Sequence, residues 1–202
     1  MTDFEAVEQL VLAERQSRVM HRQKDLEDCY WDDATVTTSW TAGSADAYLH
    51  AGDATSRRAE ADPDERIINR SVAPLVHMGP DGDRAWAELP TESNHWIKVN
   101  GVPAVWTSYM QLVYRCEKRD GVWKVADLSS LFNNDKLAPV VPGADLRIDP
   151  KELEGLRPAY FWMSYIRRHA GGQVSDDMPG TDRPEDVARM YDYDEKWVKK
   201  EA

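Results

Sequence analysis

Two charged side chains near the N-terminus are spaced so that they would share one side of a helix. Glu14 and Arg18 lie four residues apart and continue the stripe of Val7 and Val11. Two interpretations remain open. If the stripe faces the core, a carboxylate and a guanidinium enter an apolar interior together, where an unpaired charge is costly. If it faces solvent, the two form an ordinary surface ion pair worth a few tenths of a kcal/mol, roughly.

His95 is the strongest single candidate for acid–base chemistry. On a strand spanning residues 84–99, alternation places it on one face with small and aliphatic residues, namely Ala85, Ala87, Leu89 and Ile97. An imidazole there could act as a general base or donate to a ligand, or it could be a satisfied core histidine. Arg70, between Ile68 and Val72, could bind a carboxylate or phenolate, or be a solvated charge at a strand end.

Other catalytic signatures are missing from the sequence. It contains no GxSxG, GxGxxG or phosphate-binding glycine loop, and no CxxC or HExxH spacing. The five histidines are scattered, and Cys29 and Cys116 are interpreted as two free thiols. We therefore expect neither a metal site nor an organic cofactor.

The overall charge restricts the partners. A net charge of −11 argues against nucleic acid, because phosphate backbones bind basic surfaces. No segment approaches the ~20 apolar residues of a membrane span, and the acidic, interrupted N-terminus does not resemble a signal peptide. These features predict a cytoplasmic protein without a membrane or nucleic-acid partner.

The elements that must position these residues follow from periodicity. Helical patterns cover residues 4–21 and 24–31, and a third helix is expected from a Ser44 cap to about residue 59. Strands are predicted at 34–40 and then, as a meander, at 67–78, 84–99, 105–118 and 122–132, because apolar and polar residues alternate there. The sequences GPDGD, NG and RDG predict the three hairpin turns of the meander. One face of such a sheet must be buried, and the helices before it can cover it, so the fold class is α+β.

The residues after the last predicted strand are expected to form an extension of the domain. Residues 133–202 contain an irregular stretch, a possible helix at 151–170 interrupted by Pro158, and an amphipathic helix after Asp182. We therefore expect a domain at 1–132 and an extension at 133–202, whose short helices pack on the domain or on a neighbouring subunit.

Three motifs carry a resemblance to a known family. YWDDATV, GPDGDRAWAE and YRCEKRDGVWKV, between residues 30 and 125, are similar to the SnoaL-like branch of the nuclear-transport-factor-2-like (NTF2-like) superfamily. Tyr30, Asp33 and Ala34 match the family's aromatic-x-x-Asp-Ala element. The resemblance implies a cone in which a curved antiparallel sheet wraps around the N-terminal helices and leaves an apolar cavity. It also implies that Tyr30 packs inward and that Asp33 closes the second helix.

The resemblance bears on function as well. Family enzymes such as scytalone dehydratase typically work by acid–base catalysis without a cofactor. The tyrosine, aspartate and histidine of the dehydratases would fall at Glu14, at Val19 and at Asn69 or Arg70, so that machinery is not retained. The resemblance implies a cofactor-independent lyase or isomerase acting on a hydrophobic aromatic or polycyclic molecule. The alternatives are a non-catalytic ligand-binding or assembly module and the small subunit of a ring-hydroxylating dioxygenase.

The candidate residues divide into two groups. Those assigned to catalysis are His95, Glu14 and Arg70. Those assigned to ligand binding are Arg18, Tyr30, Tyr48, Asn69 and Asn133. A homodimer or homotrimer is expected through an apolar convex sheet face to which Trp86, Trp96, Trp106 and Tyr114 would contribute.

Overall fold

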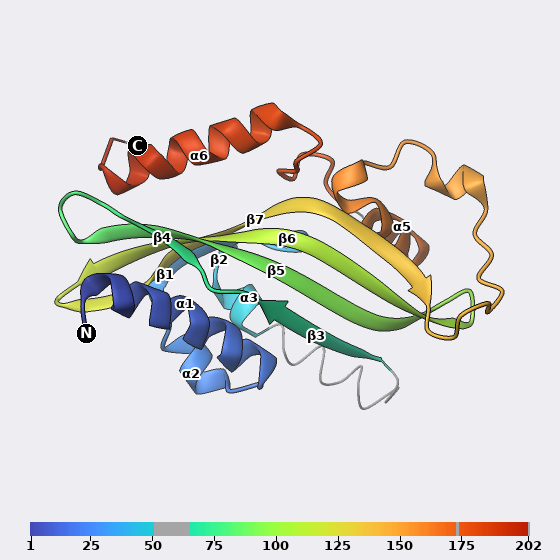
Figure 1. The fold of residues 1–202 in the computed structure, drawn as a ribbon, viewed down its shortest axis with the longest axis horizontal. Coiled ribbons are helices and arrows are strands. Elements are labelled where there is room, and N and C mark those ends of the chain that lie inside the picture. Colours follow the sequence, from blue (N-terminus) through green and yellow to red (C-terminus); the bar gives the residue numbers. More distant parts are fainter. Residues whose placement is uncertain (51–64, 173, 202) are drawn as a thin grey trace.

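The computed structural model describes residues 1–50, 65–172 and 174–201 (Figure 1). The helices are α1 (Asp3–Val19), α2 (Gln23–Glu27), α3 (Asp46–Leu49), α5 (Phe161–His169) and α6 (Pro184–Val198), with short 3-10 helices η1 (Pro150–Leu153) and η2 (Pro158–Tyr160). The strands are β1 (Tyr30–Thr37), β2 (Ala42–Ser44), β3 (Arg66–Ser71), β4 (Leu75–Met78), β5 (Arg84–Val99), β6 (Val102–Arg119) and β7 (Val122–Pro139).

All seven strands belong to one sheet, in the order β2-β1-β7-β6-β5-β3, with β4 also paired to β5. β1 runs parallel to β7, and the other pairs are antiparallel. The predicted hairpin turn at Asn100-Gly101 is confirmed, and both residues have positive φ, as a two-residue turn of this type requires. That turn sets the register, in which Ala87 lies opposite Tyr114 and His95 opposite Trp106.

The sheet has an inner face, defined here as the one covered by α1, and an outer face. α1 and α2 lie on one side of the sheet and α6 on the other (Figure 1). Thr2 caps α1 through its hydroxyl, and Glu5 bonds back to the Thr2 N–H, so the helix begins with a capping box. The core between α1 and the inner face is apolar and fully buried, and includes Val7, Val11, Val36, Leu89, Leu112 and Leu128.

The C-terminal extension continues the sheet before it leaves it. β7 runs to Pro139, so the domain boundary expected at residue 132 falls inside a strand. The segment predicted as one interrupted helix at 151–170 forms η1, η2 and α5, and Pro158 begins η2. Tyr160 and Met163 then pack on Trp106 and Phe132 at the far end of the inner face.

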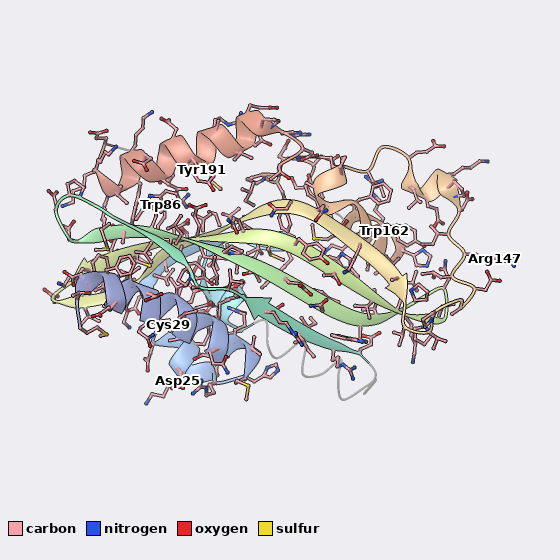
Figure 2. The ribbon with its side chains drawn as sticks, viewed as in Figure 1. Asp25, Cys29, Trp86, Arg147, Trp162 and Tyr191 are labelled. Carbon is pink, nitrogen blue, oxygen red and sulfur yellow. The ribbon has the colours of Figure 1, made fainter. Side chains whose placement is uncertain are left out.

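α6 covers the outer face. Trp197 and Val198 pack on Trp86 and Val113, and Figure 2 shows Trp86 and Tyr191 in the layer between sheet and helix. The predicted oligomer face is therefore wrong in three of its four residues. Trp86 is buried under α6, while Trp106 and Tyr114 lie on the inner face.

The fourth residue, Trp96, lies on the outer face with the Arg66 guanidinium stacked on its ring. The oligomeric state itself stays a prediction.

Three smaller expectations need correction. β1 already begins at Tyr30, so Asp33 belongs to a strand and pairs with Arg119 instead of closing α2. The strand expected at 67–78 is divided in two, because Pro74 cannot donate to the sheet ladder. The residue before α3 is Ala45 instead of Ser44, and the part of the predicted helix beyond residue 50 lies outside the described residues.

No helix among the described residues is long and apolar enough to cross a membrane.

Charged side chains fasten α6 to the sheet. Arg115, on β6, donates to Asp194 of α6 (Nε–Oδ1, 2.6 Å) and to Asp127 of β7. Glu88, on β5, accepts from Tyr191 of α6 and contacts His77 of β4. Burial, together with the nearby Asp127 and Glu88 carboxylates, outweighs the attraction of Arg115 and raises the pKa of Asp194 from 3.8 to about 6.

This raised pKa predicts a pH-dependent contribution to stability. Because the folded pKa of Asp194 exceeds the unfolded one, its contribution is complete below about pH 4 and is lost as the pH rises through 6. The difference between 3.8 and about 6 corresponds to roughly 3 kcal/mol. Asp194→Asn should therefore gain free energy of unfolding relative to the unchanged protein between pH 4 and 7, measured by urea denaturation.

The matched control is Asp192→Asn, which removes an exposed carboxylate of the same helix. Its difference from the unchanged protein should stay constant over this range. An equally constant difference for Asp194→Asn would contradict the assignment.

Candidate functional site

A buried carboxylate lies at the centre of the N-terminal half of the fold. Glu14 has no exposed surface and accepts five hydrogen bonds from four side chains. The donors and their distances are Arg15 Nε (2.6 Å) and Nη2 (2.8 Å), Arg18 Nε (3.3 Å), Tyr30 Oη (3.0 Å) and Tyr114 Oη (2.8 Å). We call Glu14, Arg15, Arg18, Tyr30, Tyr48 and Tyr114 the Glu14 cluster.

The cluster holds Glu14 in its ionised form. The guanidiniums of Arg15 and Arg18 and the bond from Tyr114 outweigh the opposing effect of burial and lower the pKa of Glu14 from 4.5 to about 2. Burial and the Glu14 charge raise the pKa of the Tyr30 and Tyr114 phenols well above the usual range. A carboxylate this acidic and this fully bonded is a weak proton acceptor near neutral pH. The geometry therefore favours a positioning role for Glu14 over the predicted catalytic one.

Arg18 differs from Arg15 because one of its guanidinium nitrogens has no hydrogen-bond partner among the described residues. Both Glu14 and Arg18 turn inward, so the surface ion-pair interpretation is wrong. Arg18 donates from Nη1 to the Tyr48 carbonyl oxygen (3.1 Å), and its guanidinium carbon lies 3.6 Å from the centre of the Tyr48 ring. Its Nη2 is buried and has no hydrogen-bond partner among the described residues.

A second group of polar side chains crosses the inner face beyond α1. Asn69, Ser93, Ser108 and Asp135 lie opposite one another on β3, β5, β6 and β7, and we call them the polar row. Neighbours in such a row have Cβ atoms about 5 Å apart. The Asn69 Oδ1 and Ser108 Oγ atoms are buried and have no hydrogen-bond partner within the described chain. Unsatisfied buried groups normally require an explanation, and a bound molecule is one.

His95 occupies the next row across the sheet. Its Nε2 lies 2.9 Å from Ser93 Oγ, and its ring lies against Trp106, with ring centres 4.2 Å apart. Trp106 is fixed in turn, because its indole N–H donates to Asp135 (3.0 Å). The imidazole is thus oriented from two sides on the face where the sequence predicts it.

The C-terminal extension holds this part of the inner face in place. Asp135 also accepts the backbone N–H groups of Trp162 (2.9 Å) and Met163 (2.7 Å) at the start of α5. Burial raises the pKa of Asp135, while these backbone bonds, the largest opposing effect, lower it. Asp135 therefore connects α5 to the Trp106 indole that contacts His95.

The two groups lie apart on the sheet. Glu14 contacts Tyr114, which is opposite Ala87, and His95 lies eight residues further along β5. At about 3.3 Å per residue this amounts to roughly 26 Å of strand. The structure therefore does not bring Glu14 to His95, and the two cannot act on one proton.

The other predicted site residues divide between these places. Tyr30 and Tyr48 belong to the Glu14 cluster, and Asn69 belongs to the polar row, as an inward-facing residue. Arg70 is exposed, opposite Glu92 on the outer side, and joins neither group. The Asn133 side chain is exposed, and its carbonyl oxygen accepts from Thr181 of the extension (3.0 Å).

Sequence reasoning missed several residues of both groups, namely Arg15, Tyr114, Ser93, Trp106, Ser108 and Asp135. Alternation along β5 could have found Ser93, which lies two residues before His95. Helical periodicity could also have found Arg15, which lies four residues after Val11 and eight after Val7 on the same stripe.

The described residues contain no group of histidine, cysteine, aspartate and glutamate side chains arranged to hold a metal ion.

A curved sheet covered on one face by an N-terminal helix agrees with the NTF2-like fold expected from the sequence motifs. A hexachlorocyclohexane dehydrochlorinase (LinA), type 2, superposes with a TM-score of 0.55 at 17% identity, covering 69% of this chain and 93% of that one. LinA-type3 from Novosphingobium barchaimii superposes with a TM-score of 0.51 at 17% identity, covering 72% of this chain and 93% of that one. At these identities the likeness concerns the fold.

Sequence relatives are distant. Pea pathogenicity protein 2 of Fusarium vanettenii is 25% identical over 179 residues, which covers 88% of this chain and 75% of that protein. An uncharacterized protein of Emericella nidulans is 24% identical over 163 residues, which covers 78% of this chain and 67% of that protein. No protein-family profile matches the chain.

The Glu14 cluster predicts a large effect of neutralising its one carboxylate. Glu14→Gln leaves the buried Arg15 and the partly buried Arg18 guanidiniums without a counter-charge, so the free energy of unfolding at pH 7 should fall by about 3–5 kcal/mol. Glu8→Gln is the matched control, because Glu8 is on the same helix, half-buried, and in no ion pair with a described residue. Its effect should stay within about 0.5 kcal/mol. Similar losses for both variants in urea denaturation would contradict the assigned role.

Proposed function

We propose that this protein is a cofactor-independent lyase or isomerase that acts on a hydrophobic small molecule bound against the inner face of the sheet. The observation that carries the proposal is the placement of His95. The imidazole is oriented by Ser93 and Trp106, one row from the buried Asn69 Oδ1 and Ser108 Oγ atoms, which have no hydrogen-bond partner among the described residues. A positioned base beside unused polar groups is the arrangement that acid–base catalysis needs.

The chemistry assigned to His95 is removal of a carbon-bound proton. In an elimination, the electron pair of the broken C–H bond forms the new C=C bond, and the leaving group departs with its own bonding pair. In an isomerisation, the same base would return the proton at another carbon. The Ser108 hydroxyl would donate to the oxygen or leaving group on which charge develops, and the Asn69 Oδ1 atom would accept a hydrogen bond from a ligand hydroxyl. The name of the LinA relatives, dehydrochlorinase, describes an elimination on this fold and supports the reaction class.

An aromatic or polycyclic ligand suits the surroundings of His95. Met110, next to the polar row, and Ile67, opposite His95, are partly exposed apolar residues of the same face, whereas Trp106 and Phe132 are already covered by Tyr160 and Met163. Flat rings pack well on such side chains while a few polar groups fix their orientation. The substrate class therefore remains that expected from the sequence.

A second candidate, a non-catalytic ligand-binding or assembly module, has one observation in its favour. Glu14, the carboxylate nearest the helix position used by the dehydratases, is locked as an anion with a pKa of about 2. A fold whose best buried acid cannot exchange protons near neutral pH could serve to bind a ligand only.

Proton exchange distinguishes the two candidates. The protein would be incubated in D2O with 2-tetralone, a bicyclic ketone with exchangeable hydrogens, and separately with hexachlorocyclohexane. Deuterium uptake would be followed by NMR and chloride release by ion chromatography. We expect acceleration of at least one reaction, and a loss of about 10²-fold or more in His95→Ala, the usual contribution of a general base.

His169→Ala is the control, because it removes an exposed imidazole on α5. It should retain the full rate. Equal rates for His95→Ala and the unchanged protein would remove the catalytic role of His95 and favour the binding module.

A further inference from the structure

The Glu14 cluster carries an unbalanced charge in the protein interior. It contains two guanidiniums, Arg15 and Arg18, and one carboxylate, Glu14, while the raised pKa values of Tyr30 and Tyr114 keep those phenols neutral. The sum is one positive charge. Burying an unpaired charge is strongly unfavourable, so a structure that does so commonly supplies the missing partner from elsewhere.

The excess charge is localised on Arg18. Arg15 bonds Glu14 through two nitrogens, and its Nη2 also donates to the Tyr48 hydroxyl (2.8 Å). Glu14 already accepts five bonds, so it has little capacity left for the Arg18 Nη2 group. A buried N–H without an acceptor costs about 1–3 kcal/mol, and more when it belongs to a charged group.

The path of α1 brings Arg18 toward the polar row. Asp3, at the start of the helix, bonds Lys118 and Trp123 beside the β6–β7 turn, and Glu14 bonds Tyr114. The helix therefore advances along β6 toward lower residue numbers, which lead to Ser108. Figure 1 shows α1 lying along the sheet in this sense.

The distance between Arg18 and the polar row follows from the rise of the strand and of the helix. Six residues of strand from Tyr114 to Ser108 span about 20 Å, and Arg18 lies about 6 Å beyond Glu14 along the helix. Roughly 14 Å of inner face then separates Arg18 from the polar row. The residues of β5 and β6 in this interval are Thr91, which is buried, and Met110, which is half-buried.

We infer that Arg18 is the anion-binding residue of the ligand site, and that the ligand is an apolar ring system carrying one carboxylate. The carboxylate accepts from the Arg18 Nη2 group, and the rings extend over Met110 toward Asn69 and Ser108. The Tyr48 ring, between the Arg18 guanidinium and the Trp40 ring, holds the guanidinium in place. This inference deepens the proposed function and relies on it for the location of the ligand, but it requires no turnover.

The test compares 2-naphthoate with its neutral analogue 2-naphthamide by isothermal titration calorimetry on the full chain at pH 7.5. The net charge of −11 repels anions, so a preference for the carboxylate must arise locally. We expect 2-naphthoate to bind at least tenfold more tightly than 2-naphthamide. Arg18→Met should reduce the difference to less than twofold while 2-naphthamide binds as before.

Two further variants complete the test. Arg22→Met is the matched control, since Arg22 is exposed and pairs only with Asp25 among the described residues, and it should keep the full preference. Arg18→Lys keeps the positive charge and should keep part of the preference for 2-naphthoate. This variant also tests the inference if Arg18→Met does not fold. Absence of 2-naphthoate binding, equal binding of the two compounds, or an unchanged preference in both Arg18 variants would overturn the inference. If the preference depends on Arg18 but His95→Ala exchanges protons normally, the anion site stands and the catalytic proposal fails.

Discussion

The bonding of one carboxylate, Glu14, organises the N-terminal half of this protein. It joins α1 to β1 through Tyr30 and to β6 through Tyr114, while Arg15 and Arg18 extend the connection to Tyr48 of α3. Hydrogen bonds to a buried charge are stronger than neutral ones and fix the direction of each donor. Apolar packing of Val7 and Val11 could be satisfied by several placements of the helix on the sheet, but the two directed bonds from Tyr30 and Tyr114 to Glu14 cannot. The position of α1 relative to the sheet therefore depends on this cluster.

Much of the fold follows from local sequence signals. A two-residue turn at Asn100-Gly101 forces the numbers of paired residues on β5 and β6 to add to 201, so 87 pairs with 114 and 95 with 106. The faces of Tyr114 and Trp106 could thus have been predicted once His95 was assigned inward, and placing them on the convex face was an avoidable error. The boundaries of β5 agree with the sequence prediction because turn residues mark them, and the start of α6 agrees because Pro184 marks the first turn of that helix.

The candidate site was less accessible to prediction. Periodicity identifies the stripe that holds Glu14, but whether it is buried depends on Tyr30 and Tyr114, which lie 16 and 100 residues away along the chain. The role of Asp135 depends on backbone N–H groups 27 and 28 residues later, and no local pattern announces such a contact. The stretch between β7 and η1, residues 140–149, has no sustained period, so no local pattern predicts its conformation.

The attachment of α6 to the outer face has a consequence for how that surface behaves on dilution. A neighbouring molecule that covered Trp86 and Val113 would dissociate at low concentration, as any bimolecular partner does. A helix on the same chain is present at a fixed effective concentration set by its linker. The shielding of these large apolar side chains is consequently independent of how much protein is present, and each copy of the chain carries its own cover.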